Sequence, residues 1–172
     1  MMTFNQQIFY LFYNLTVKYP WIDTYVVFFA EYLPYIIVLT VLVFWYLAMI
    51  SRKKKKYNGY LLAMFSGLMG ALIANLSQHY LIFQRPFIHF SFEPLFKVVS
   101  YSFPSAHATG LFALSTGVYL TNKKLGVLTY VASFIVVISR IVAGVHYPID
   151  ILAGMILGCL IAFAIVRLYK YE

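Results

Sequence analysis

The chain has few of the residues that build a water-soluble surface or a covalent framework. Only 10% of its 172 residues are charged and five are acidic, whereas 63% are hydrophobic. The mean hydropathy of +0.82 excludes an ordinary soluble domain. A single cysteine, Cys159, excludes a disulfide or a cysteine-based metal site within one chain. The N-terminus lacks the charged start and cleavage site of a signal peptide, so we expect an uncleaved chain.

Apolar stretches are abundant, and most approach the roughly 20 residues that a helix needs to cross a bilayer. We therefore predict an all-α integral membrane protein, a single domain over residues 1–172 built as a bundle of about five transmembrane helices. The predicted spans are 24–50, 60–83, 105–120, 126–143 and 149–169.

The N-terminal segment has a different pattern. Apolar residues recur at helical spacing, with amide side chains and Lys18 between them. This pattern is typical of an amphipathic helix that lies in the membrane interface. The alternative is a sixth membrane helix, which its several amides disfavour. The apolar positions are Phe4, Ile8, Leu11, Phe12 and Leu15.

The net charge of +8 comes from basic residues at the ends of apolar runs. They cluster at 52–56, at 123–124, and at Arg167 and Lys170. Cations placed in this way indicate membrane orientation rather than nucleic-acid binding, and five alternating spans put all three clusters in the cytoplasm. The opposite face then receives residues 84–104, the turn at 144–148 and the N-terminal segment.

Ionisable residues nevertheless collect on that opposite face, where the orientation rule does not explain them. Three clusters come from the ends of different spans: Arg85-Pro86, residues 103–107, and Arg140 with His146 and Asp150. Charged groups near hydrocarbon are costly, so their convergence at one depth indicates a shared site.

The composition of these clusters favours a phosphate ligand. Pro104 and Pro148 each stand where a helix is expected to begin, and the unpaired amides and dipole of a helix N-terminus attract anions. Arg85 and Arg140 add fork-shaped donors that match phosphate oxygens in pairs.

Two histidines fit the chemistry of phosphoryl transfer. His146 and Asp150 are four residues apart, so the carboxylate can hold one ring nitrogen of the imidazole and leave the other free as a nucleophile. His107, from another helix, can then protonate the departing oxygen.

These motifs resemble the three signatures of the type-2 phosphatidic acid phosphatase superfamily. Arg85-Pro86 is similar to the end of the first, residues 104–107 to the second, and the spacing from Ser139-Arg140 to His146 and Asp150 to the third. The resemblance implies a phosphohistidine on His146, general acid catalysis by His107, and phosphate binding by Arg85, Ser105 and Arg140. It also implies catalysis without a metal or another cofactor.

Two positions depart from the superfamily pattern. Gln78 stands where the first signature usually has a lysine, and Ala106 replaces the glycine of the second. Because Gln78 carries no charge, we expect Lys97 to be a candidate for supplying the positive charge of the missing lysine.

Within the superfamily, the short chain and the phrases around Phe103-Pro104-Ser105 and residues 144–148 resemble the bacitracin-resistance type of undecaprenyl-diphosphatase. This resemblance implies hydrolysis of undecaprenyl diphosphate on the extracytoplasmic face of the bacterial inner membrane, which recycles the carrier lipid of cell-wall synthesis. Two enzymatic alternatives are a phosphatidylglycerophosphate phosphatase and a lipid A 1-phosphatase. A small channel or transporter subunit is the non-enzymatic alternative, which the gathering of ionisable residues at one face disfavours.

Three further ionisable residues lie outside the signatures. Glu31 is inside the first predicted span, where an unpaired carboxylate is costly, so it is either a substrate-binding residue or a structural partner. His79 and His89 have no carboxylate beside them at ligand spacing, which gives a metal site no support. The predicted partners are therefore the lipid substrate and the membrane; the sequence indicates no oligomeric state.

Overall fold

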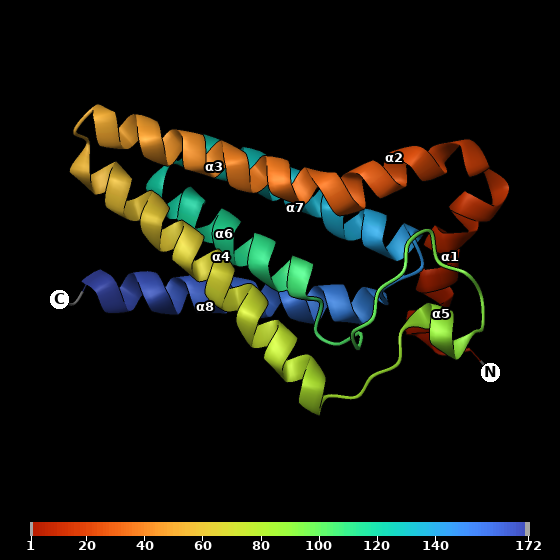
Figure 1. Ribbon diagram of the computed structural model, residues 1–172. Helices are drawn as coiled ribbons and strands as arrows, with labels where there is room; N and C mark the ends of the chain where they lie inside the picture. Colours follow the sequence, from red (N-terminus) through yellow and green to blue (C-terminus); the bar gives the residue numbers. More distant parts are fainter. Residues whose placement is uncertain (1, 171–172) are drawn as a thin grey trace.

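The computed structural model describes residues 2–170, and every regular element in that range is helical (Figure 1). This confirms the predicted all-α fold. In chain order the elements are α1 Phe4–Lys18, η1 Pro20–Ile22, α2 Asp23–Val27, η2 Phe28–Tyr32, α3 Leu33–Ile50, α4 Lys54–Tyr80, α5 Pro86–His89, α6 Ala106–Thr121, α7 Lys123–Val142 and α8 Pro148–Lys170.

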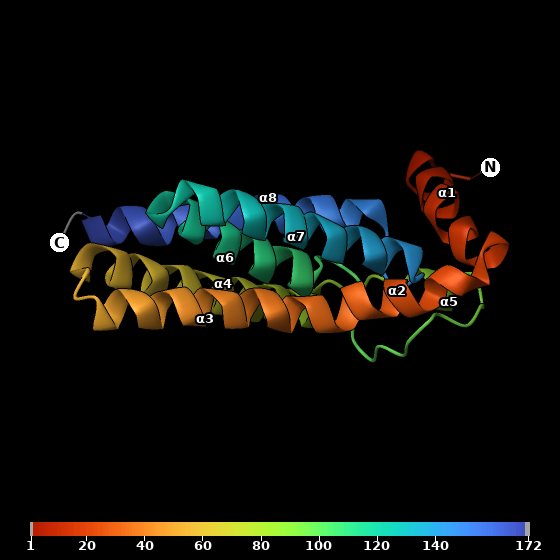
Figure 2. The ribbon, with the colours of Figure 1, turned by 90° about the horizontal axis from the view of Figure 1, so that it is seen from above.

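Four helical stretches within residues 2–170 are long and apolar enough to cross a membrane: Pro20–Ile50, Lys54–Tyr80, Lys123–Val142 and Pro148–Tyr169. A fifth helix, α6, has 16 residues and lies between α4, α7 and α8 in the middle of the bundle (Figures 1 and 2). These five helices correspond to the five predicted spans, and the protein is a multi-pass membrane protein.

The second predicted span, about 60–83, corresponds to α4, whose ends differ from it by a few residues. α4 begins at Lys54 rather than at residue 60, because long lysine side chains in a first turn can reach the membrane surface. It ends at Tyr80 rather than at residue 83. The chain is extended at Arg85, where the following Pro86 disfavours helical backbone angles.

Small residues allow α6 to pack closely between α4 and α8. A Cβ atom on Gly117 would lie 2.5 Å from the Cα of Ala63 on α4. A Cβ on Gly158 of α8 would clash with the carbonyl oxygen of Thr109. Helix approaches as close as these require small residues at the contacts. The close packing fixes the position of α6 and hence of the residues at its N-terminus.

The first span is not a uniform α-helix. Its η2 segment is a π-helical turn in which the Leu33 N–H donates to the carbonyl of Phe28. Pro34 follows Ala30 by four residues and has no N–H, so it cannot donate to the Ala30 carbonyl. The Ala30 carbonyl therefore lacks its usual helical donor and can accept a hydrogen bond from another part of the bundle.

The helix predicted at the N-terminus is present as α1 and crosses the end of the bundle at an angle (Figure 2). Its position across the end of the bundle, at an angle to the long helices, favours the interfacial placement over a sixth span. Phe9 of α1 is fully buried, with its ring 5.5 Å from that of Tyr147 and 6.2 Å from that of Phe90. α1 thereby packs against the residue next to His146.

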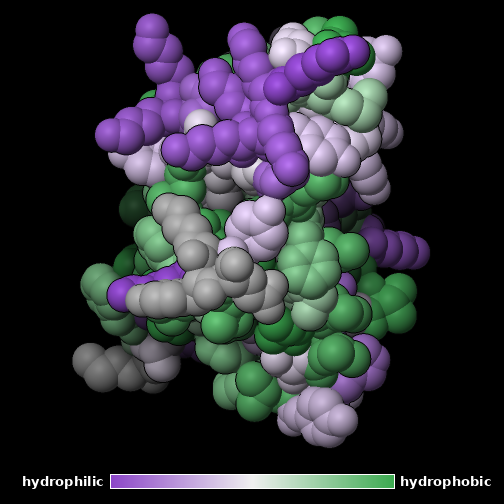
Figure 3. Space-filling model, turned by 90° about the vertical axis from the view of Figure 1, so that its left-hand side faces the viewer, coloured by the Kyte–Doolittle hydropathy of each residue, from purple (hydrophilic) through white to green (hydrophobic). Residues whose placement is uncertain are grey.

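The two ends of the bundle differ in charge. The α3–α4 turn, the α6–α7 turn and the C-terminal end of α8 lie at one end, and the N-terminus, α1 and α5 lie at the other (Figure 1). Exposed basic residues 52–56 belong to the first end, where Figure 3 shows hydrophilic side chains gathered over the α3–α4 turn. The predicted site residues occupy the opposite end.

Candidate active site

The structure brings the three predicted clusters together around one cavity. Arg85 lies just before α5, His107 in the first turn of α6, Arg140 near the end of α7 and His146 in the turn before α8. All four line a cavity of about 480 Å³. Arg85 and His146, for example, are 61 positions apart in the chain and are in direct contact.

His146 and Asp150 form the centre of the site and are both about 2% exposed. The Asp150 Oδ2 atom lies 3.5 Å from the His146 Nδ1 atom. This is an ion-pair distance rather than a short hydrogen bond, and Nδ1 has no other hydrogen-bond partner among residues 2–170. The same Oδ2 atom accepts hydrogen bonds from the Ser102 hydroxyl and, at 2.8 Å, from the Tyr147 N–H. Asp150 is therefore held in place by two donors while it faces the imidazole.

The other ring nitrogen of His146 faces two donors. Arg85 Nη1 lies 3.2 Å from His146 Nε2, and the Ser105 Oγ lies 3.3 Å from it. Because a guanidinium can only donate, Nε2 must be the unprotonated nitrogen, and the proton of the neutral ring is on Nδ1, toward Asp150. Burial lowers the pKa of His146 well below 6.5, and the charges of Arg85 and Arg140 lower it further. The imidazole is consequently neutral and offers a lone pair on Nε2.

Arg85 is 2% exposed and most of its donors are bound to main-chain carbonyls. Nε donates to the Ser100 carbonyl at 2.6 Å, Nη1 to that of Val145 at 2.7 Å and Nη2 to that of Tyr101 at 3.0 Å. Burial, with the nearby charge of Arg140, lowers its pKa to about 10, so it remains protonated at neutral pH. Arg85 thus ties residues 100–101 to the turn that carries His146.

Arg140 is equally buried but has fewer partners. Its Nη1 atom donates to the Ala30 carbonyl at 3.2 Å and lies 3.4 Å from Glu31 Oε1. Its Nε has no hydrogen-bond partner among residues 2–170. The ring of Phe96 covers the guanidinium at 5.4 Å. Arg140 therefore keeps donor capacity for an anion in the cavity that it lines.

The N-terminus of α6 is joined to α8 at the site. Ser105 is the N-cap of α6, where its hydroxyl accepts from the Ala108 N–H, and its own N–H donates to the Asp150 carbonyl at 3.1 Å. The second and third signature motifs are thus hydrogen-bonded to each other. This contact helps to position His107, which is in the first turn of α6, so that it lines the cavity together with His146.

Gln78 and Lys97, the two residues considered for the missing lysine, differ in position. Gln78 is 2% exposed, lines the cavity and donates from Nε2 to the Pro104 carbonyl at 2.7 Å. Its Oε1 atom is buried and has no partner within residues 2–170. Lys97 is exposed, and the part of the cavity lining that the structure describes does not include it. The site therefore contains Gln78 but not Lys97.

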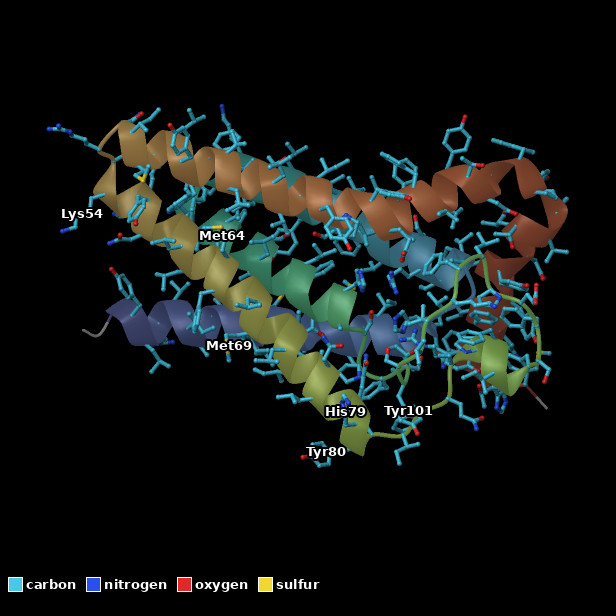
Figure 4. The ribbon with its side chains drawn as sticks, viewed as in Figure 1. Lys54, Met64, Met69, His79, Tyr80 and Tyr101 are labelled. Carbon is cyan, nitrogen blue, oxygen red and sulfur yellow. The ribbon has the colours of Figure 1, made fainter. Side chains whose placement is uncertain are left out.

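The cavity has one polar end and one apolar end. Its polar end contains Arg85, His107, Arg140 and His146, and the rest extends between α3, α4 and α6. In Figure 4, Tyr101 lies in the loop near the polar end, and Met64 on α4 marks the apolar part. The apolar lining consists of Pro34, Val38, Met64, Leu68, Leu111 and Leu114, among others.

Several contacts of the site were not predicted from the sequence. Ser102 holds Asp150, and Ser100 accepts from Arg85 through both its carbonyl and its hydroxyl. Nothing in the pattern of residues 84–104 singled out these two serines. The availability of the Ala30 carbonyl could have been predicted from the sequence, because Pro34 lies four residues later and cannot be its helical donor.

Comparison with protein families places these motifs in a known group. The family model of the PAP2 superfamily matches residues 57–172. Among curated proteins, the chain is 31% identical to the bacitracin transport permease protein BcrC of Bacillus licheniformis, over 87% of this chain and 72% of that protein. It is 30% identical to the undecaprenyl-diphosphatase BcrC of Bacillus subtilis, over 95% of this chain and 83% of that protein.

Two solved structures share the fold. A transmembrane PAP2-type phosphatidylglycerolphosphate phosphatase from Bacillus subtilis superposes with a TM-score of 0.72 and 20% identity, over 96% of this chain and 86% of that one. Aquifex aeolicus LpxE superposes with a TM-score of 0.70 and 21% identity, over 96% of both chains. At these identities the similarity is one of helical arrangement.

Proposed function

The chain belongs to the PAP2 superfamily, and on that premise we propose that it is a membrane lipid phosphatase that hydrolyses undecaprenyl diphosphate to undecaprenyl phosphate and phosphate. The observation that carries the proposal is the neutral His146, whose Nε2 atom faces a cavity lined by two buried arginines. A diphosphate fits the charge of that end, and an isoprenoid chain fits the apolar lining between α3, α4 and α6. The identity to the two BcrC proteins supports this substrate over the other lipid phosphates.

The first step in the proposed mechanism forms a phosphohistidine. His146 Nε2 attacks the terminal phosphorus, and the bond from phosphorus to the bridging oxygen breaks as the lipid monophosphate leaves. His107, which becomes protonated once the anionic diphosphate lies beside it, donates a proton to that leaving oxygen. Arg140 and the donors of Arg85 and Ser105 that face Nε2 turn to the phosphate oxygens as substrate enters. The positive charge on the phosphorylated ring is balanced by Asp150.

The second step returns the enzyme to its starting state. His107, now neutral, takes a proton from a water molecule, whose oxygen attacks the phosphorus as the bond to His146 breaks. Inorganic phosphate leaves, and both histidines recover their original protonation. All groups in this sequence belong to the chain, the substrate or water, and the proposed reaction uses no metal or other cofactor.

We place the active site on the extracytoplasmic face of the bacterial inner membrane. The exposed basic residues 52–56 lie at the end of the bundle opposite the cavity. Positive residues favour the cytoplasmic side, so the cavity faces outward.

The test is phosphate release by detergent-purified protein in EDTA, with undecaprenyl diphosphate, phosphatidylglycerophosphate, phosphatidic acid and lipid A assayed side by side. We expect preference for the diphosphate and loss of release in folded His146→Ala protein. Preference for another lipid would keep the mechanism and make that lipid the substrate. No release from any of the four would refute the enzymatic function and favour the transporter alternative, which the name of the Bacillus licheniformis relative also suggests.

A further inference from the structure

Glu31 is an anion beside the site that belongs to none of the three signature motifs. It lies in the π-helical turn η2, next to Ala30, and its Oε1 atom is 3.4 Å from Arg140 Nη1. The Glu31 side chain is 43% exposed, whereas that of Arg140 is 3% exposed. The carboxylate therefore approaches the guanidinium from the outside of the cavity.

This ion pair contributes little to folding. The carboxylate is half-exposed, and its single 3.4 Å contact is long for a charge-assisted hydrogen bond, so the attraction that it gains is modest. The position of Arg140 does not depend on it, because the Ala30 carbonyl also accepts from Nη1 at 3.2 Å. The carboxylate thus has an effect on the electrostatic potential of the cavity that is separate from its small effect on stability.

Arg140 can serve two anions. Glu31 occupies one side of its Nη1, while the unpartnered Nε shows that the guanidinium still has a donor to offer. A phosphate bound at Arg140 would lie near the Glu31 carboxylate and be repelled by it. Among the charged residues at this end, the two buried arginines attract phosphate, and Asp150 is held behind His146 by Ser102 and Tyr147.

We propose that Glu31 is a positioning counter-ion whose charge repels phosphate bound at Arg140, weakens phosphate binding, and thereby promotes release of the phosphate product. This inference rests on the proposed function of Arg140 as a phosphate ligand. It adds a residue of the first span, outside the part of the chain that the family model matches, to the machinery of the site.

The test is calorimetric binding of inorganic phosphate to the detergent-solubilised full chain at low salt. Glu31→Gln keeps an oxygen for Arg140 Nη1 but removes the charge, so we expect roughly fivefold to tenfold tighter phosphate binding. Glu31→Ala should tighten it as well, because the charge is absent there too. The matched control is Glu93→Gln, which removes one exposed charge from the same end of the bundle and should leave affinity unchanged.

A second measurement tests the effect of Glu31 on release of the phosphate product during hydrolysis. We expect phosphate to inhibit lipid hydrolysis by Glu31→Gln at roughly fivefold lower concentration than in the wild type, with the difference shrinking in about 0.5 M salt. Unchanged or weaker phosphate binding in both Glu31 variants overturns the inference while leaving lipid hydrolysis by the wild type intact. A wild-type protein that hydrolyses no lipid phosphate and binds no inorganic phosphate overturns this inference and the proposed function together.

Discussion

Replacing Asp150 with Asn removes the negative charge behind His146 with little change in shape. One atom, Oδ2, accepts from the Ser102 hydroxyl and the Tyr147 N–H and faces His146 Nδ1 at 3.5 Å. An asparagine can place its single carbonyl oxygen at that position and keep all three contacts. The variant should therefore fold and differ from the wild type mainly in charge.

The size of the effect follows from the geometry of the pair. At 3.5 Å and an effective dielectric constant of about 20, opposite unit charges attract by roughly 5 kcal/mol. Because only part of the positive charge has developed on the ring in the transition state, we expect a loss of about 3–4 kcal/mol, or roughly 10²- to 10³-fold in kcat.

The assay is phosphate release from saturating undecaprenyl diphosphate, with thermal unfolding of the same preparation as a check on folding. Ser102→Ala is the matched comparison, because it removes a neutral donor and keeps the carboxylate, and it should cost roughly tenfold or less in kcat. A folded Asp150→Asn protein with kcat within threefold of the wild type would refute the role assigned to this charge.

Three other perturbations test separate features of the molecule. Because burial and the charges of Arg85 and Arg140 lower the pKa of His146, its neutral form persists as pH falls, so we expect the part of the kcat/KM profile that depends on His146 to decline only below pH 6.5; a His146-dependent acid limb above pH 6.5 would contradict this. Gln78→Ala leaves the buried Pro104 carbonyl without its donor and should lower the free energy of unfolding by about 1–3 kcal/mol, measured by denaturant titration. The control is Asn58→Ala, which removes a solvent-exposed hydrogen bond to Tyr169 at the basic end. Gly117→Leu forces α4 and α6 apart at the Ala63 contact, so the yield of folded protein, measured by size-exclusion chromatography, should fall sharply. A normal yield would show that the two helices can separate more easily than the 2.5 Å approach implies.

Some features of the site could be predicted from the sequence and others could not. Arg85, His107, Arg140, His146 and Asp150 could be assigned to one face because each stands at the same end of a predicted span. Their mutual contacts could not be derived, since Arg85 meets Val145 and His146 across 60 and 61 positions of chain. The same limit applies to Lys97, which was a candidate for the missing lysine and is exposed away from the described cavity lining.

By itself the sequence determined the helical class, the number of main helices, the separation of the basic end from the end with the candidate site, and the small residues that let α6 pack between its neighbours. These follow from hydropathy, periodicity and residue size, which act within one helix or at one membrane depth. Only the tertiary structure decided that Arg85 binds the carbonyls of Ser100, Tyr101 and Val145, and that Arg140 meets Ala30 and Glu31. Such contacts depend on how helices from distant parts of the chain approach one another, and no local pattern encodes that distance.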